Sequence, residues 1–343
     1  MTQHLDPSAT VFDLGEKILI EEILRPLFNP NRERNSVGDD CAAVEIPSSS
    51  FAIVSTDRVP ADLISFRAGV LDFQNFGRYL GVLNLSDLAA CGGVPLALLF
   101  NCGLPKELLI RDFVSISAGF QQIAVQFGAK VVGGDITSSL ELSLSATALG
   151  YVEKDRMLRR AGAKIGDTVF VSREIGLTPI ALDYCLRREQ YEWLSESERV
   201  QLEGQFNLIE PEILLGRKLS QSGYCTSCMD NTDGVGQSLA ELARESNCSM
   251  VILHDKLQLE PLVTRAAMRK NCDPIEFAFG PGADFSLIGT LAGDWTRQRA
   301  KNLLGVNVHV IGKVTRGSGV FLQSGDSIIP FNVQGWNYFR QTP

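Results

Sequence analysis

Apolar residues recur along the chain with two spacings, which predict alternating helices and strands. The helical spacing predicts helices over residues 13–27, 72–90, 106–127 and 295–304, and another that ends at Arg244. Alternation and short apolar runs predict strands over residues 51–54, 96–100, 130–132, 142–152, 168–172, 250–253, 285–291 and 306–314. The charged segment 187–203 has no sustained apolar stripe, which is typical of a surface helix or an excursion from the core. An α/β fold is therefore predicted.

Polar residues interrupt the apolar pattern in the last turns of the predicted helix 72–90. Asn84, Ser86 and Asp87 stand there among small and apolar neighbours, in the stretch LNLSDLAACGG. A charge in such surroundings is costly to bury without a partner, so it is more typical of a ligand than of a solvated face. We predict that residues 84–87 anchor a functional site.

Aspartates next to small or glycine residues recur at the ends of apolar segments. They occur in four predicted turns, VGDDCAAV (37–44), STD (55–57), GGD (133–135) and MDNTD (229–233). Carboxylate oxygens are the ligands that hard cations prefer beside a polyphosphate. The four segments together predict a magnesium and nucleotide site assembled from distant parts of the chain. Taken alone, the aspartates of VGDD are better interpreted as a solvated turn, and a helix cap is an alternative interpretation of the Asp and Thr residues in 229–233.

Three further features are compatible with bound phosphate. Gly133 and Gly134 precede Asp135 and would let phosphate oxygens approach main-chain N–H groups. The turn 229–233 precedes a predicted helix, whose N-terminal N–H groups favour anions. Arg160 is suited to pair with a phosphate, but a solvated surface arginine is an equally good interpretation of its position.

Length and charge narrow the class of protein. A chain of 343 residues suits two domains better than one. The net charge of -8 argues against a nonspecific nucleic-acid binder, because such proteins need clustered Lys and Arg. No apolar run reaches the length of a membrane span, and the N-terminal residues lack the features of a signal peptide. A cytoplasmic protein with neither nucleic-acid nor membrane partners is expected.

Cysteine and histidine argue against two other kinds of site. The eight cysteines are too few for a disulfide scaffold in so long a chain, and we interpret them as reduced. Cys225 and Cys228 have the spacing of half a zinc knuckle, but no second pair follows, so structural packing is the favoured interpretation. With three histidines, a histidine-based triad is not expected.

The order and spacing of the motifs resemble the thiamine-monophosphate kinases of the aminoimidazole ribonucleotide synthetase superfamily. The matching stretches are VGDDCAAV, STD, NLSDLAACGGVP, VVGGD, RAGAKIGDTVFVS, MDNTDG and the terminal GWNYF. The resemblance implies a two-domain α/β (α+β) fold like that of the synthetase. Residues 1–153 would form an N-terminal sheet-and-helix domain that binds ATP and magnesium and pairs in a homodimer. Residues 154–343 would form a C-terminal α/β sandwich.

The resemblance also implies a set of site residues. The metal ligands would be Asp40, Ser55, Thr56, Asp57, Asp87, Asp135, Asp230 and Asp233. Among them, Asp87, Asp135 and Asp233 would serve catalysis. Gly134, Arg160 and Thr232 would contact ATP, and Ser65, Asp284 and Trp336 would contact the substrate. The implied reaction transfers the γ-phosphoryl group of ATP to the phosphate of thiamine monophosphate, a small-molecule acceptor.

The chain departs from the family pattern on the acceptor side. Ser65 replaces a family histidine, and GPGADFSL stands where the family has GGEDYEL, which leaves Asp284 of its acidic residues. Glu210 replaces the arginine of an Arg-Pro pair, and REIGLT replaces GTPGDS. Two alternatives therefore stay open. One is a divergent enzyme that phosphorylates another small phosphate, or an amide or carbonyl oxygen; the other is a catalytically silent nucleotide-binding protein.

Overall fold

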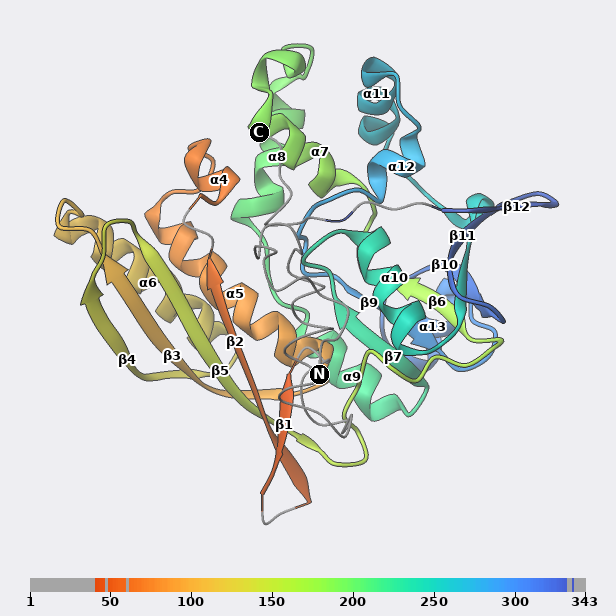
Figure 1. Ribbon diagram of the computed structural model, residues 1–343, viewed down its shortest axis with the longest axis horizontal. Coiled ribbons are helices and arrows are strands. Elements are labelled where there is room, and N and C mark those ends of the chain that lie inside the picture. Colours follow the sequence, from red (N-terminus) through yellow and green to blue (C-terminus); the bar gives the residue numbers. More distant parts are fainter. Residues whose placement is uncertain (1–40, 47–48, 60–61, 332–334, 336–343) are drawn as a thin grey trace, which may run out of the picture.

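The structure is a computed structural model, and it describes residues 41–46, 49–59, 62–331 and 335. Two sheets with their own helices lie side by side, and helix α5 (Phe73–Ala90) runs between them (Figure 1). The first sheet ends with strand β5 at Glu153, and the second begins with strand β6 at Thr168. The helix predicted over residues 13–27 lies outside the described residues.

The first sheet has five strands in the order β1-β2-β5-β3-β4. Their bounds are β1 Ala42–Glu45, β2 Ser50–Val59, β5 Ser143–Glu153, β3 Val94–Leu104 and β4 Lys130–Ser138. Neighbouring strands are antiparallel except for the parallel pair β3 and β4. Helices α5 and α6 (Ile110–Gln126) cover one face, here called the inner face (Figure 1). The inward Ala146 and Ala148 of β5 are buried, whereas Leu149 on the outer face is 37% exposed.

The second sheet has seven strands in the order β12-β11-β8-β10-β6-β9-β7. Their bounds are β6 Thr168–Val171, β7 Cys225–Asp230, β8 Ser249–Leu253, β9 Leu287–Leu291, β10 His309–Thr315, β11 Gly319–Ser324 and β12 Ser327–Pro330. Its helices are α7 Leu177–Leu186, α8 Glu196–Asn207, α9 Ile213–Ser222, α10 Val235–Glu245, α11 Pro261–Lys270, α12 Pro274–Ala278 and α13 Arg297–Leu304. Neighbours are antiparallel except β8 and β11.

Helix α5 is held at backbone distance from helices on two sides. A Cβ atom placed on Gly77 would lie 1.9 Å from the carbonyl oxygen of Ile116 in α6. A Cβ on Gly119 of α6 would lie 1.9 Å from the carbonyl oxygen of Gln74, and one on Gly216 of α9 would lie 2.0 Å from that of Ala89. These contacts exist only because glycine has no side chain. They fix where the polar residues of α5 point.

Arg217 of α9 joins the two halves close to the end of α5. Its guanidinium donates to both carboxylate oxygens of Glu153, at 2.9 and 3.0 Å, and to the carbonyl oxygen of Gly92 at 2.8 Å. The bidentate hydrogen bonds lower the pKa of Glu153 to about 2. The last strand of the first sheet is thereby tied to a helix of the second half.

Most elements that the sequence predicts are present, but two segments predicted as turns are strands. The helix 72–90 is confirmed as α5, with Asp72 as its N-cap. The predicted turns at Ser55–Asp57 and Gly133–Asp135 are wrong, because β2 continues to Val59 and β4 continues to Ser138. Long pairing with β5 and β3 supplies hydrogen-bond partners through both segments, which outweighs their local preference for a turn.

Alanine at position 119 should destabilise the fold. The added methyl group would force α5 and α6 apart, and we expect Gly119→Ala to lower the free energy of unfolding by about 1–3 kcal/mol or more. Denaturant unfolding measures this value. Gln121→Ala, on the exposed side of the same helix, is the control and should change stability little. Equal effects of the two substitutions would contradict the close packing of α5.

Candidate active site

Strand β2 and helix α5 bring together two of the predicted acidic segments. The hydroxyl of Ser55 donates a hydrogen bond to Oδ2 of Asp87. The main-chain N–H of Asp57 donates to Oδ1 of Asn84 at 3.1 Å, and Nδ2 of Asn84 donates to the carbonyl oxygen of Leu80 at 3.0 Å. Asn84 is fully buried and Asp87 is 9% exposed. The predicted anchor at residues 84–87 therefore meets the segment STD.

Strand alternation separates Thr56 from its two neighbours. Ser55 and Asp57 face α5, whereas the hydroxyl of Thr56 donates to the carbonyl oxygen of Ala146 at 2.9 Å and accepts from the hydroxyl of Thr147 at 3.1 Å. In one copy of the chain, the side chain of Thr56 thus lies on the opposite face from the side chains of Ser55, Asp57 and Asp87.

Asp135 also lies on the outer face, on edge strand β4. It is exposed and pairs in register with Asn101 of β3. The neighbouring Gly134 has a packing role, because a Cβ atom there would lie 1.7 Å from the carbonyl oxygen of Phe100. The close approach of two strands accounts for this glycine without a bound phosphate.

Asp230 ends β7 next to α5, and the following turn holds Thr232 and Asp233. Asp230 is buried, and Thr232 and Asp233 are half-buried. The fold positions this turn through Asn231, whose Oδ1 accepts from the N–H of Gly234 at 3.1 Å. Helix α10 begins directly after it, as the sequence predicts.

A pocket of about 90 Å³ lies between elements of the two halves. Its wall is mostly apolar, with Leu63, Ile64, Tyr79, Leu83, Leu182 and Phe206, and the remaining lining residues are Asp62, Ser65, Thr178, Thr232, Gly282 and Ala283. Ser65 is buried, and within the described part of the chain its hydroxyl has no hydrogen-bond partner. Ser65 and Thr232, predicted for the substrate and for ATP respectively, thus share one pocket.

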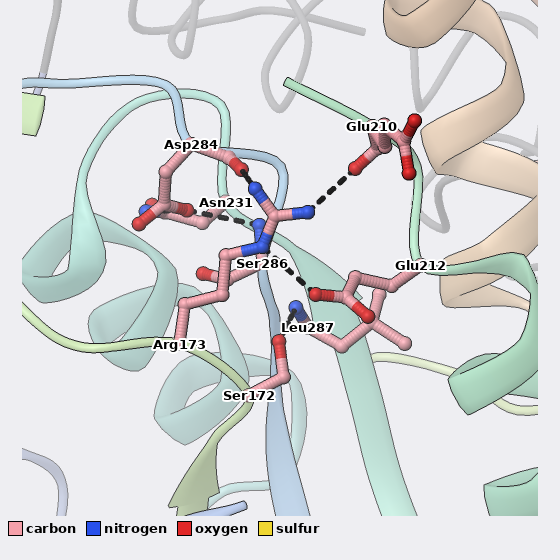
Figure 2. A network of polar contacts seen from close by, with 8 residues as sticks. All are labelled: Ser172, Arg173, Glu210, Glu212, Asn231, Asp284, Ser286 and Leu287. Atoms are coloured by element: carbon pink, nitrogen blue, oxygen red, sulfur yellow. Dashed lines mark hydrogen bonds and ion pairs between the residues drawn. The ribbon is translucent and has the colours of Figure 1, made fainter. Parts of the chain in front are cut away.

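Asp284 lies beside this pocket, at the centre of a polar network (Figure 2). Its Oδ1 accepts from Nδ2 of Asn231 and from the N–H of Ser286, both at 2.9 Å. Its carbonyl oxygen accepts from Nη1 of Arg173 at 2.9 Å. The pocket wall contains the preceding Gly282 and Ala283, so the structure gives Asp284 protein partners where the sequence suggested a substrate.

Other predicted residues fall outside these clusters. Arg160 lies 3.7 Å from a carboxylate oxygen of Glu241 on α10 and is partly exposed. Asp40 and Trp336 lie outside the described residues. The apolar pocket residues and Asn231 were missed, because nothing in a local pattern distinguishes a pocket wall or a buried hydrogen-bonding amide from ordinary core.

The carboxylates offer oxygen donors, the type that Mg²⁺ prefers. Among the described residues, however, no group of three or more His, Cys, Asp and Glu side chains is arranged to hold a metal. The donor chemistry fits magnesium, which in proteins is commonly held by one or two carboxylates together with water and substrate phosphate oxygens. Across the described chain, none of the helices is both long and apolar enough to cross a membrane.

Comparisons with known proteins agree over most of the chain. Residues 38–152 match the family described as "AIR synthase related protein, N-terminal domain". The thiamine-monophosphate kinase of Pyrococcus horikoshii is 29% identical over 338 residues, covering 94% of this chain and 97% of that protein. The enzyme of the same name from Aquifex aeolicus is 29% identical over 328 residues, covering 95% and 99%.

Solved structures extend the match to the whole fold. The structure "AaThiL complexed with AMPPCP and TMP" has a TM-score of 0.80 at 26% identity and covers 97% of this chain and 100% of that one. A chain of the HypE–HypF complex has a TM-score of 0.72 at 17% identity, which shows a shared fold alone.

These matches define a member of the AIR synthase superfamily, with its α/β fold. Within that superfamily, the chain is similar along almost its whole length to the thiamine-monophosphate kinases. The predicted family, fold class and enzyme class, an ATP-dependent kinase, are thereby confirmed.

Removing the side chain of Asn84 should weaken the link between α5 and β2. In Asn84→Ala the N–H of Asp57 loses its acceptor, and we expect a loss of about 1–3 kcal/mol in the free energy of unfolding. Denaturant unfolding with circular dichroism measures the loss. The control is Gln201→Ala on the exposed side of α8, and unfolding free energies equal to the wild type in both variants would contradict the structural role of Asn84.

Proposed function

We propose that this protein transfers the γ-phosphoryl group of ATP to the phosphate of thiamine monophosphate, giving thiamine diphosphate and ADP. The observation that carries the proposal is the full-length match, at a TM-score of 0.80, to a structure described as holding AMPPCP and TMP. A cytoplasmic location, where ATP is available, is part of the proposal.

The interdomain pocket suits this reaction. Phosphoryl transfer depends on positioning and on neutralising charge more than on a strong base. The apolar wall, with Tyr79, Leu83 and Phe206, is suited to an aromatic ring of the acceptor. Thr232 lines the same pocket. It lies between Asp230 and Asp233 in the sequence, so it provides a hydroxyl on the side of the pocket next to these carboxylates.

Magnesium is the proposed partner of the acidic residues. When bound, it would supply positive charge that neutralises the polyphosphate. Ser55, Asp57 and Asp87 on the inner side of β2, together with Asp230, are the proposed core of its ligand set. Asp40, Thr56, Asp135 and Asp233 are proposed to complete it, with Asp87, Asp135 and Asp233 serving catalysis. Gly134, Arg160 and Thr232 are proposed to contact ATP.

A second copy of the chain is proposed to pack on the outer face of the first sheet. None of the described helices packs on this face (Figure 1). In register across it, Val54 pairs with Leu149, Thr147 pairs with Leu99, and Leu99 is 40% exposed. Apolar side chains gathered on a sheet face favour a protein partner. Thr56 and Asp135 share this face, so homodimerisation would place them at or near the interface.

A different acceptor is the second candidate, and the pocket residues favour it specifically. Ser65 and Ala283 are small and uncharged, although the family pattern has a histidine and an acid at these positions. A site without those groups would recognise an acceptor mainly by apolar contact. The same assay, with other small phosphates and with amide or carbonyl compounds, distinguishes the two candidates.

Incubation with ATP, Mg²⁺ and thiamine monophosphate tests the proposed reaction. We expect thiamine diphosphate to form, and we expect Asp87→Asn to lower kcat by at least about 100-fold, because the replacement keeps the shape but removes the charge. Asp326→Asn, in the exposed turn between β11 and β12, is the matched control and should be fully active. ATP binding without transfer to any acceptor would support the silent alternative, and an active Asp87→Asn variant would contradict the metal assignment.

A charge on the outer face should separate the proposed dimer. We expect Leu149→Lys to elute as a monomer in size-exclusion chromatography with light scattering, whereas the wild type elutes as a dimer. Leu208→Lys, at a residue 78% exposed after α8, is the control and should remain a dimer. A wild-type monomer, or a dimeric Leu149→Lys, would contradict this interface.

A further inference from the structure

Asn231, between Asp230 and Thr232, is held by every polar group it has. Its N–H donates to the carbonyl oxygen of Ser286 at 2.9 Å, and its carbonyl oxygen accepts from the N–H of Phe285 at 3.1 Å. In the side chain, Oδ1 accepts from Gly234 and Nδ2 donates to Oδ1 of Asp284. Asn231 is 2% exposed, so water does not readily replace these partners.

The loop that carries Asp284 is fixed in turn. Phe285 is fully buried with a positive φ of 52°, and its ring meets that of Tyr79, a pocket residue, edge to face at 5.4 Å. Arg173 ties the carbonyl oxygen of Asp284 to the segment 210–212, through the carbonyl oxygen of Glu210 at 2.6 Å and the carboxylate of Glu212 at 2.8 Å (Figure 2).

We propose that Asp284 is a positioning residue, whose carboxylate oxygen holds Asn231 and thereby fixes the direction of Asp230, Thr232 and Asp233. The hydrogen bond between Asp284 and Asn231 is buried. It joins the loop of Gly282 and Ala283, which lines the pocket, to the segment 229–233. The role of Asp284 is that of an oxygen acceptor and does not depend on a charge presented to the substrate. This inference rests on the proposed function, because it assigns the turn to the magnesium nucleotide.

Three substitutions distinguish the two hydrogen bonds that the carboxylate of Asp284 accepts, from Asn231 and from Ser286. Asp284→Asn keeps an oxygen for both Asn231 and Ser286. Asp284→Ser keeps a hydroxyl near the N–H of Ser286, as serine does in turns, but is too short to reach Asn231. Asp284→Ala loses both. If Asp284→Ala fails to fold by circular dichroism, Asp284→Ser still tests the bond to Asn231.

Calorimetric titration of the full-length protein with the unreactive analogue AMPPCP, with and without Mg²⁺, measures the effect without any acceptor. We expect Asp284→Ser and Asp284→Ala to weaken binding of the magnesium nucleotide by about 10-fold or more, as for other residues that orient metal ligands. Asp284→Asn should bind within about 2-fold of the wild type, because both acceptor contacts remain. In turnover assays, the KM for thiamine monophosphate should change much less than the Mg²⁺ requirement.

The opposite pattern overturns the inference. If Asp284→Asn binds the magnesium nucleotide as weakly as Asp284→Ala does, the charge of Asp284 is needed. If Asp284→Ser binds it like the wild type, the hydrogen bond to Asn231 is not needed. Wild-type protein that binds AMPPCP equally with and without Mg²⁺ also overturns it. Absence of thiamine diphosphate in the turnover assay removes the proposed acceptor alone, and the calorimetric comparison still decides the role of Asp284.

Discussion

The backbone contacts of helix α5 are the constraint on which the rest of the structure depends. Gly77 and Gly119 let it touch α6, and Gly216 lets α9 touch it from the second half of the chain. A helix held this closely on two sides has little freedom to rotate, so Asn84 and Asp87 must point at β2. The same helix supplies Tyr79 and Leu83 to the pocket. One packing arrangement therefore sets the positions of Asn84 and Asp87 and of this part of the pocket wall together.

Buried and half-buried polar groups connect the parts that this packing brings together. Asn84 bonds to β2, Arg217 joins α9 to Glu153, and Asn231 joins the acidic turn to the loop of Asp284. Asn84 and Asn231 would be costly to bury without partners, so the native arrangement is one in which both are hydrogen-bonded. For a kinase whose chemistry depends on placing charges, such bonds serve orientation as much as stability.

Local pattern was sufficient for helices α5, α6, α10 and α13 and for the strands that it predicted, but it missed helices α7, α9, α11 and α12. The spacing of apolar residues in 72–90 predicts α5 correctly, and the aspartate motifs with their neighbours indicate the family. Local pattern failed where pairing with a distant strand outweighed the preference of the segment itself for a turn. Gly133 and Gly134 suggest a turn, yet they lie in β4 because β3 offers a hydrogen-bonding edge along their whole length.

The sequence by itself determined the chemistry available to this protein: carboxylates beside small residues, and an order of motifs that the thiamine-monophosphate kinases share. Tertiary structure alone decided which of these groups meet. Ser55 and Asp57 face Asp87 while Thr56 faces away, and Asp284 turns to Asn231 instead of lining the pocket. The reason is that the face on which a side chain emerges, and its partner there, depend on strand pairing and helix packing between segments far apart in the chain.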